Sequence, residues 1–188
     1  MTDNLYWDNF YEKKTITTEP SNFCITILEF FKNHENLNIL DAGCGNGKDS
    51  YALASKHNVV GIDICNNKNK DVNNCKFKIA DFCNYNKKNF DLIYSRFTFH
   101  SITNEKHDEF LKSINQNSYL CIEARSDKDK DSYRFFGDDH YRNFINIDYL
   151  KIILKKYNFK ILLLEERNNV AIYKNENPIC IRAICIKE

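Results

Sequence analysis

The chain has 188 residues, of which 43% are hydrophobic and 14% aromatic, and its formal net charge is +1 at pH 7. It can therefore bury the core of one domain, and its balanced charge argues against a general nucleic-acid or membrane-surface binder, which would carry a basic stripe. No stretch approaches the roughly 20 apolar residues of a membrane span, and residues 1–4 lack the basic and apolar regions of a signal peptide, so we expect a cytoplasmic protein.

Eight cysteines could indicate disulfides or a metal site, but they never form a Cys-x-x-Cys pair. Most of them lie in apolar runs, where a free thiol acts as a small hydrophobic side chain. We therefore expect free cysteines and no zinc or other metal site.

The N-terminal region contains an aromatic cluster, Tyr6, Trp7 and Tyr11. Core packing is the simplest role for this cluster, and a lid over a bound cofactor is the alternative. After Pro20, apolar residues recur at the spacing of a helix. These residues are Phe23, Ile27, Phe30 and Phe31.

A glycine-rich loop follows the strand predicted at 37–42 and contains Gly43, Gly45 and Gly47. Glycine permits the backbone angles of a tight turn and lets a ligand lie against the main chain. A dinucleotide-binding loop has the spacing G-x-G-x-x-G, whereas the third glycine here comes one residue early, and Asp41 would repel a pyrophosphate. An acid at this position suits a cofactor with an ammonium and a sulfonium group, which indicates S-adenosylmethionine. The alternative is an ordinary strand-to-helix turn.

Two further apolar runs end in acids that could contact the same cofactor. The strand predicted at 58–63 ends in Asp63, a candidate acceptor for ribose hydroxyl groups, and Ile64 follows it. After the strand predicted at 76–80, Asp81 could accept a hydrogen bond from the adenine amino group, and Phe82 offers an apolar face to the purine. Each acid alone could be an ordinary strand-end residue.

The rest of the chain continues the alternation of strands and helices. A strand at 90–95 ends in Ser95 and is followed by Arg96, and a helix is expected at 105–114. Further elements are predicted as a strand at 118–124, a helix at 147–157, and strands at 159–165 and 179–186. This alternation predicts an α/β fold with a parallel sheet covered on both faces.

Together, the motifs between residues 36 and 125 resemble those of class I S-adenosylmethionine-dependent methyltransferases. The resemblance implies a Rossmann-like, seven-stranded, mostly parallel sheet with an antiparallel final strand and helices on both faces. It also implies one domain, 1–188, made of an N-terminal lid and helix region (1–35), a cofactor-binding core (36–125), and an acceptor loop with the C-terminal helix and strands (126–188).

The resemblance also implies roles for individual residues. Asp41 and the three glycines would surround the methionine part of S-adenosylmethionine, and Ser95 and Arg96 would close the site near the transferred methyl group. Four shorter motifs are similar to those of small methyltransferases associated with surface polysaccharide or glycan synthesis. They lie at 6–11, 95–101, 123–126 and 140–142.

A long connection from 125 to 143 follows the fifth predicted strand, at the edge of the sheet where open α/β folds bind ligands. Its Arg125, His140, Tyr141 and Arg142 would suit a substrate with a phosphate, a carboxylate or sugar hydroxyl groups. The alternative is that the two arginines pair with acidic residues, namely Asp138, Asp139 or Glu123.

His100 lies a few residues beyond the fourth predicted strand, where the resembling enzymes place groups that contact the acceptor. Its ordinary pKa, about 6.5, suits a general base. A structural histidine bonded to a backbone carbonyl is the alternative. Together with Arg96 and the residues of the long connection, His100 completes the candidate substrate-binding set.

We therefore expect methyl transfer from S-adenosylmethionine, leaving S-adenosylhomocysteine, to a small polar acceptor, with a sugar or sugar nucleotide as the candidate. Transfer to oxygen is favoured over nitrogen because His100, His140 and Tyr141 offer proton acceptors. One alternative is a non-catalytic S-adenosylmethionine-binding subunit that supports a partner enzyme, which the intact Asp41, Asp63 and Asp81 disfavour. Another is a protein or nucleic-acid methyltransferase, which the neutral charge disfavours. We expect a monomer or a homodimer without a membrane partner.

Overall fold

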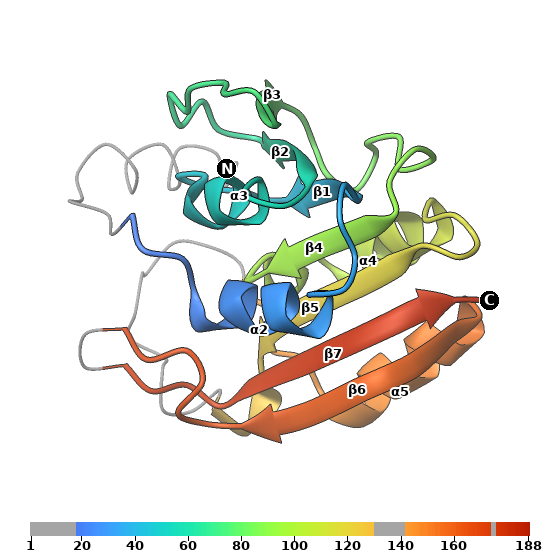
Figure 1. Cartoon of the computed structure of the whole chain (residues 1–188). Helices are drawn as coiled ribbons and strands as arrows, with labels where there is room; N and C mark the ends of the chain where they lie inside the picture. Colours follow the sequence, from blue (N-terminus) through green and yellow to red (C-terminus); the bar gives the residue numbers. More distant parts are fainter. Residues whose placement is uncertain (1–17, 130–141, 174–175) are drawn as a thin grey trace.

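The structure is a computed structural model that describes residues 18–129, 142–173 and 176–188 (Figure 1). Its strands form one seven-stranded sheet in the order β3-β2-β1-β4-β5-β7-β6. The strands are β1 (Asn38–Ala42), β2 (Asn58–Asp63), β3 (Cys75–Ile79), β4 (Leu92–Arg96), β5 (Tyr119–Arg125), β6 (Phe159–Arg167) and β7 (Cys180–Lys187). The α-helices are α2 (Asn22–Phe30), α3 (Lys48–Leu53), α4 (Asn104–Lys112) and α5 (Ile147–Lys156), and the short 3-10 helices are η1 (Phe99–Ser101) and η2 (Asp127–Asp129).

Most of the sheet is parallel. β1 is parallel to β2 and β4, and β3 and β5 extend this parallel part on either side. β7 runs antiparallel between β5 and β6. The predicted Rossmann-like sheet with an antiparallel final strand is therefore confirmed. Because parallel strands end on the same side, the segments that follow β1 to β5 meet at one edge of the sheet, where ligands bind in open α/β folds.

Helices cover both faces of the sheet: α2 and α3 lie on one face, and α4 and α5 lie on the other (Figure 1). Neighbouring residues of β1 show the division. Ile39 packs with buried side chains of α2 and α3, whereas Leu40 packs with those of α4 and α5. Since side chains alternate along a strand, Asp41 lies on the same face as Ile39.

One buried carboxylate joins α2 to both α3 and the sheet. Asp49, in the first turn of α3, accepts hydrogen bonds from the backbone N–H and the hydroxyl of Ser21, both at 2.7 Å. It also accepts one from the hydroxyl of Tyr94 in β4 at 2.7 Å. Ser21 caps α2, because its hydroxyl accepts a hydrogen bond from the N–H of Cys24. The N-terminal cap of α2 is thus fixed beside the glycine loop.

The predicted apolar face of the N-terminal helix is correct except at one position. Phe23, Ile27 and Phe31 are buried, but Phe30 is 43% exposed. Phe30 is the last residue of α2, and Phe31 is its C-cap.

All eight cysteines fall within the described residues and carry free thiols, and all but Cys44 are buried. In the described ranges, no helix is long and apolar enough to cross a membrane.

Candidate functional site

The glycine loop joins β1 to α3 and packs tightly against its neighbours. Gly43, Gly45 and Gly47 have positive φ angles of 80°, 53° and 74°. A Cβ atom on Gly43 would lie only 2.0 Å from Cγ2 of Thr98, and one on Gly47 would lie 2.9 Å from the ring of Phe77. The loop therefore needs glycine both for its backbone angles and for the close approach of these side chains.

Asp41 lies in β1, just before this loop, and is only 2% exposed. Within the described residues its carboxyl group accepts one hydrogen bond, from the hydroxyl of Ser50 at 2.5 Å. Burial raises the pKa of Asp41 to about 7; the Ser50 hydroxyl opposes this rise, and the nearby Asp49 and Asp63 carboxylates add to it. A buried acid of this kind is suited to a cationic ligand, which would stabilise its ionised form.

Asp63 ends β2, and its carboxylate holds the glycine loop. One oxygen accepts a hydrogen bond from the N–H of Gly45 at 2.9 Å, and the other accepts one from the N–H of Cys65 at 3.0 Å. The side-chain amide of Asn69 donates to the carbonyl of Gly45 at 2.8 Å. Ile64 is partly buried beside these contacts. A carboxylate can accept about four hydrogen bonds, so one that holds the loop can also accept from ligand hydroxyl groups.

Asp81 and Phe82 follow β3 at the same edge. The Asp81 carboxylate accepts hydrogen bonds from the N–H of Cys83 at 2.9 Å and from Nζ of Lys106 at 3.1 Å. Burial acts to raise the pKa of Asp81, but these donors outweigh it and hold the pKa below its usual range. The Phe82 ring is 9% exposed and packs edge-on against Phe110, with ring centres 5.8 Å apart. Asp81 is therefore ionised at neutral pH, and Phe82 belongs to the core as well as to the site.

β4 ends in two residues with different surroundings. Ser95 is fully buried, and its hydroxyl shares a 2.6 Å hydrogen bond with that of Thr98, so it supports the turn that packs on the glycine loop. Arg96 donates from Nε to Glu123 of β5 at 2.9 Å, and its guanidinium lies 4.4 Å from the centre of the Phe97 ring. Of the two, Arg96 is the one partly open to solvent, with a side chain 23% exposed.

His100 lies in η1 and is 6% exposed. Its Nδ1 atom accepts a hydrogen bond from the backbone N–H of Arg125 at 3.2 Å, and its ring packs edge-on against Phe97. Because Nδ1 is the acceptor in this contact, the neutral ring carries its proton on Nε2. A general base would need an unprotonated Nε2, so the role of His100 expected from the sequence stays a prediction.

The other candidate acceptor residues lie on or near the connection after β5. Arg125 is 8% exposed and pairs with Glu176. Asp138 and Asp139, two of the partners suggested from the sequence, lie outside the described residues. Arg142 is partly buried. His140 and Tyr141 lie outside the described residues. The structure thus brings the ends of five strands to one edge, with Asp41, Asp63, Asp81, Arg96 and His100 among the residues there.

Sequence reasoning missed one buried ion pair at this site. Glu123 of β5 and Arg182 of β7 are paired across the strands, with Nε and Oε2 2.7 Å apart. Their exposed fractions are 0% and 2%. The available signal was a single charge inside each of two apolar runs, 122–124 and 181–183. Among the described residues, no group of three or more His, Cys, Asp or Glu side chains is arranged to hold a metal ion.

Comparison with known proteins adds to this geometry. The sequence model of a family described as a methyltransferase domain matches residues 18–164. An uncharacterized methyltransferase of Schizosaccharomyces pombe is 32% identical over 125 residues, which cover 58% of this chain and 85% of that protein. Malonyl-[acyl-carrier protein] O-methyltransferase 2 of Ilyobacter polytropus is 31% identical over 157 residues, covering 71% and 59%. The crystal structure of a SAM-dependent methyltransferase from Anabaena variabilis has the same fold, with a TM-score of 0.73, 16% identity, and coverage of 100% and 96%.

Proposed function

This chain belongs to the methyltransferase-domain family, and we propose that it transfers the methyl group of S-adenosylmethionine to an oxygen atom of a small polar acceptor. A sugar or sugar nucleotide is the leading candidate for the acceptor. The observation that carries the choice of cofactor is Asp41, a buried acid directly before the glycine loop. It suits an ammonium or sulfonium group and would repel the pyrophosphate of a dinucleotide.

The residues of the strand edge fit the parts of S-adenosylmethionine. The backbone of Gly43, Gly45 and Gly47 would lie against its methionine part, with Asp41 facing the positive charge. Asp63, next to Ile64, would accept hydrogen bonds from the ribose hydroxyl groups. When bound, the sulfonium supplies a methyl group attached to a good leaving group.

The adenine would lie at the end of β3, between Asp81 and the ring of Phe82. Asp81 is ionised and can accept a hydrogen bond from the adenine amino group. Ser95 and Arg96 would border the methyl group, Ser95 by supporting the turn after β4. The protein's own task is then to align the acceptor with the methyl group and to exclude water.

We assign the acceptor side to residues that follow β4 and β5, namely His100, Arg125, Arg142, His140 and Tyr141. His100 would donate a hydrogen bond from Nε2 to the acceptor oxygen, because its Nδ1 is already an acceptor. Removal of a proton from an acceptor hydroxyl would then fall to His140 or Tyr141. We also propose that the chain acts in the cytoplasm, as one domain with the lid, core and acceptor regions defined above.

Two observations support this choice of acceptor. The relative from Ilyobacter polytropus is named as a malonyl-[acyl-carrier protein] O-methyltransferase, which favours oxygen as the acceptor atom; this chain spans 59% of its length. The four short motifs at 6–11, 95–101, 123–126 and 140–142 support an acceptor from glycan synthesis.

A labelled-methyl transfer assay across sugars, nucleotide sugars, phosphorylated small molecules and amines tests the function. We expect transfer to an oxygen acceptor, with His100→Ala lowering turnover and Arg142→Ala raising the acceptor KM. Affinity for S-adenosylhomocysteine should stay within about threefold in both variants, because neither residue follows the strands assigned to the cofactor. Tight binding of NAD without binding of S-adenosylhomocysteine would refute the proposal, and cofactor binding without transfer to any acceptor would favour a non-catalytic subunit.

A further inference from the structure

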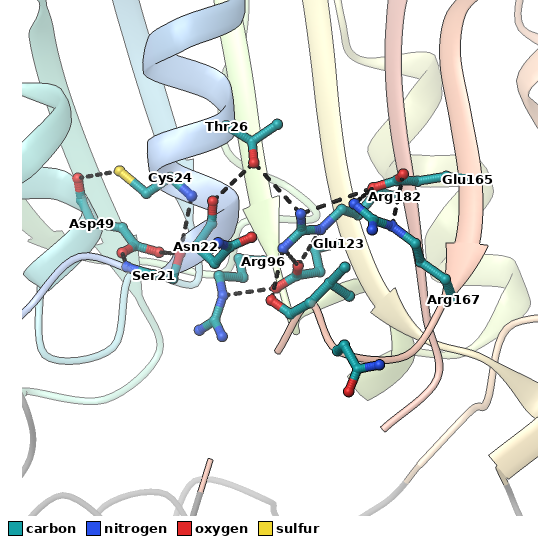
Figure 2. A network of polar contacts seen from close by, with 12 residues as sticks. Ser21, Asn22, Cys24, Thr26, Asp49, Arg96, Glu123, Glu165, Arg167 and Arg182 are labelled. Atoms are coloured by element: carbon teal, nitrogen blue, oxygen red, sulfur yellow. Dashed lines mark hydrogen bonds and ion pairs between the residues drawn. The ribbon is translucent and has the colours of Figure 1, made fainter. Parts of the chain in front are cut away.

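Three charged side chains lie next to one another on neighbouring strands. Arg96 ends β4, Glu123 lies beside it in β5, and Arg182 lies opposite Glu123 in β7 (Figure 2). One oxygen of Glu123 accepts a hydrogen bond from Nε of Arg96 at 2.9 Å, and the other accepts one from Nε of Arg182 at 2.7 Å. A single, fully buried carboxylate is therefore shared by two guanidinium groups.

Other contacts hold Arg182 in place inside the fold. Its NH2 group donates to the carbonyl of Val170 at 2.9 Å, and its guanidinium lies 5.3 Å from the centre of the Phe23 ring. Glu165 lies 3.9 Å from Arg182, but Nε of Arg167 already donates to Glu165 at 3.0 Å. Glu123 thus serves two guanidinium groups, and the Asp49 carboxylate also acts on Arg96. Because Glu123 holds Nε of Arg96, the two terminal nitrogens of this guanidinium are its donors for a bound anion.

Arg96 lies at the strand edge, at the end of β4. Among the described residues, Nε is the only guanidinium nitrogen of Arg96 that makes a hydrogen bond, and the two terminal nitrogens point away from the network (Figure 2). Lys48, at the start of α3, makes no ion pair within the described ranges. Burial and the positive charge of Arg96 lower its pKa, whereas the Asp49 and Glu123 carboxylates act to raise it, so Lys48 lies near both Arg96 and these acids. Glu123 and the Phe97 ring hold the guanidinium group of Arg96.

We propose that Arg96 binds a carboxylate through its two terminal nitrogens, and that Glu123 and Arg182 position it for this contact. A guanidinium group matches a carboxylate with two parallel hydrogen bonds, which an ammonium group cannot do. The inference rests on the proposed function, which supplies two sources of this chemistry: the methionine part of S-adenosylmethionine, and an acceptor that is itself an acid.

Calorimetry with two nucleosides separates the sources. S-adenosylhomocysteine carries the amino-acid carboxylate, whereas 5′-methylthioadenosine lacks it and keeps the adenosine part. Malonate, titrated into the protein saturated with S-adenosylhomocysteine and followed by NMR, serves as the probe for an acceptor carboxylate. Arg96→Met is the test variant, since Glu123 keeps Arg182 as a partner, and Arg96→Lys keeps the charge but loses the planar donors. Lys160→Met, which removes an exposed cation of β6 that pairs with Glu188, is the control.

If the cofactor is the source, Arg96→Met should lower the affinity for S-adenosylhomocysteine by about 10- to 100-fold and leave the affinity for 5′-methylthioadenosine unchanged. Arg96→Lys should have an intermediate affinity for S-adenosylhomocysteine. If the acceptor is the source, both nucleosides should bind as in the wild type and the malonate response should disappear. An equal loss of affinity for both nucleosides would overturn the inference, and so would unchanged binding of every probe. If the wild type binds neither nucleoside, the proposed function fails, and malonate titrated into the protein alone still decides the role of Arg96.

Discussion

Asp41 is an unusual carboxyl group, because burial raises its pKa to about 7 from an ordinary value of 3.8. The folded protein therefore keeps a proton on this side chain between about pH 4 and pH 7, where the unfolded chain has lost it. The contribution of Asp41 to the free energy of unfolding is fully present below pH 4 and is lost as the pH rises through 7. A cationic ligand reverses this preference, because it favours the ionised carboxylate.

We predict that S-adenosylhomocysteine, whose amino group is charged, binds at pH 6 with release of up to about one proton, and that its affinity rises from pH 6 to pH 7.5. Calorimetry in two buffers with different ionisation enthalpies counts the released protons. Asp41→Asn cannot ionise, so it should bind more weakly and without this proton release. An unchanged proton count in Asp41→Asn would show that another group titrates on binding.

Asp63 and Asp81 should contribute unequally to cofactor affinity. We expect Asp63→Ala to weaken the binding of S-adenosylhomocysteine by about 2 to 4 kcal/mol, because two ribose hydrogen bonds to a charged group are lost. Asp81→Ala should weaken its binding by about 1 to 2 kcal/mol. Asp91→Ala is the matched control, since Asp91 accepts a hydrogen bond from Asn38 at the opposite end of β1. Calorimetry measures the affinities, and thermal unfolding checks Asp63→Ala, which also loses the contact to Gly45. Wild-type affinity in both folded variants would exclude the assignment.

Among the helices, α2 depends on a buried polar anchor as well as on its apolar face. The Asp49 carboxylate receives three hydrogen bonds of 2.7 Å, two from Ser21 and one from Tyr94. We predict that Tyr94→Phe lowers the free energy of unfolding by about 1.5 to 3 kcal/mol, because a buried charged acceptor loses one donor. Urea unfolding measures this change.

Tyr85→Phe provides the comparison for this prediction. The Tyr85 hydroxyl contacts Nζ of Lys78 at an exposed position, at 3.2 Å. Its loss should change the free energy of unfolding by less than about 0.5 kcal/mol. Equal effects of the two substitutions on the free energy of unfolding would mean that the contact with Asp49 stabilises the protein no more than the exposed one does.

For the whole molecule, the buried thiols determine the response to alkaline pH. Burial raises the pKa of seven cysteines above the ordinary value of 9.0: Cys24, Cys44, Cys75, Cys83, Cys121, Cys180 and Cys185. The folded state keeps these protons above pH 9, where the unfolded chain loses them, so each thiol lowers the free energy of unfolding as the pH rises. Lys48, Lys87 and Lys187 have lowered pKa values and act in the opposite sense, but they are fewer.

We therefore predict that the urea midpoint falls between pH 8 and pH 10. Burial lowers the pKa of Lys87 to about 8, so its contribution to stability rises as the pH increases from about 8 to 10.5. Lys87→Met removes that rise and should make the loss of stability with pH steeper. A midpoint that increases over this range in the wild type would contradict the prediction.

The sequence by itself determined the order of strands and helices, the glycine loop and the acids at the strand ends. These features depend on neighbours along the chain: the backbone angles of Gly43 and Gly47, and the apolar runs that end in Asp63 or precede Asp81. The predicted seven-stranded sheet followed from this alternation together with the family resemblance, and the structure has it. The exposure of Phe30 was not predictable in this way, because the helical spacing places Phe30 on the same side as Phe23 and Ile27.

Only the tertiary structure decided which polar groups are partners. Glu123 and Arg182 are 59 residues apart in the chain, and they meet because β7 inserts antiparallel beside β5. The acceptor role of Nδ1 in His100 likewise depends on the backbone of Arg125, 25 residues away. Apolar periodicity places an element on a sheet face, but hydrogen bonds require contacts within a few ångströms between distant segments, so the pairing of charges and the position of a proton come only with the assembled fold.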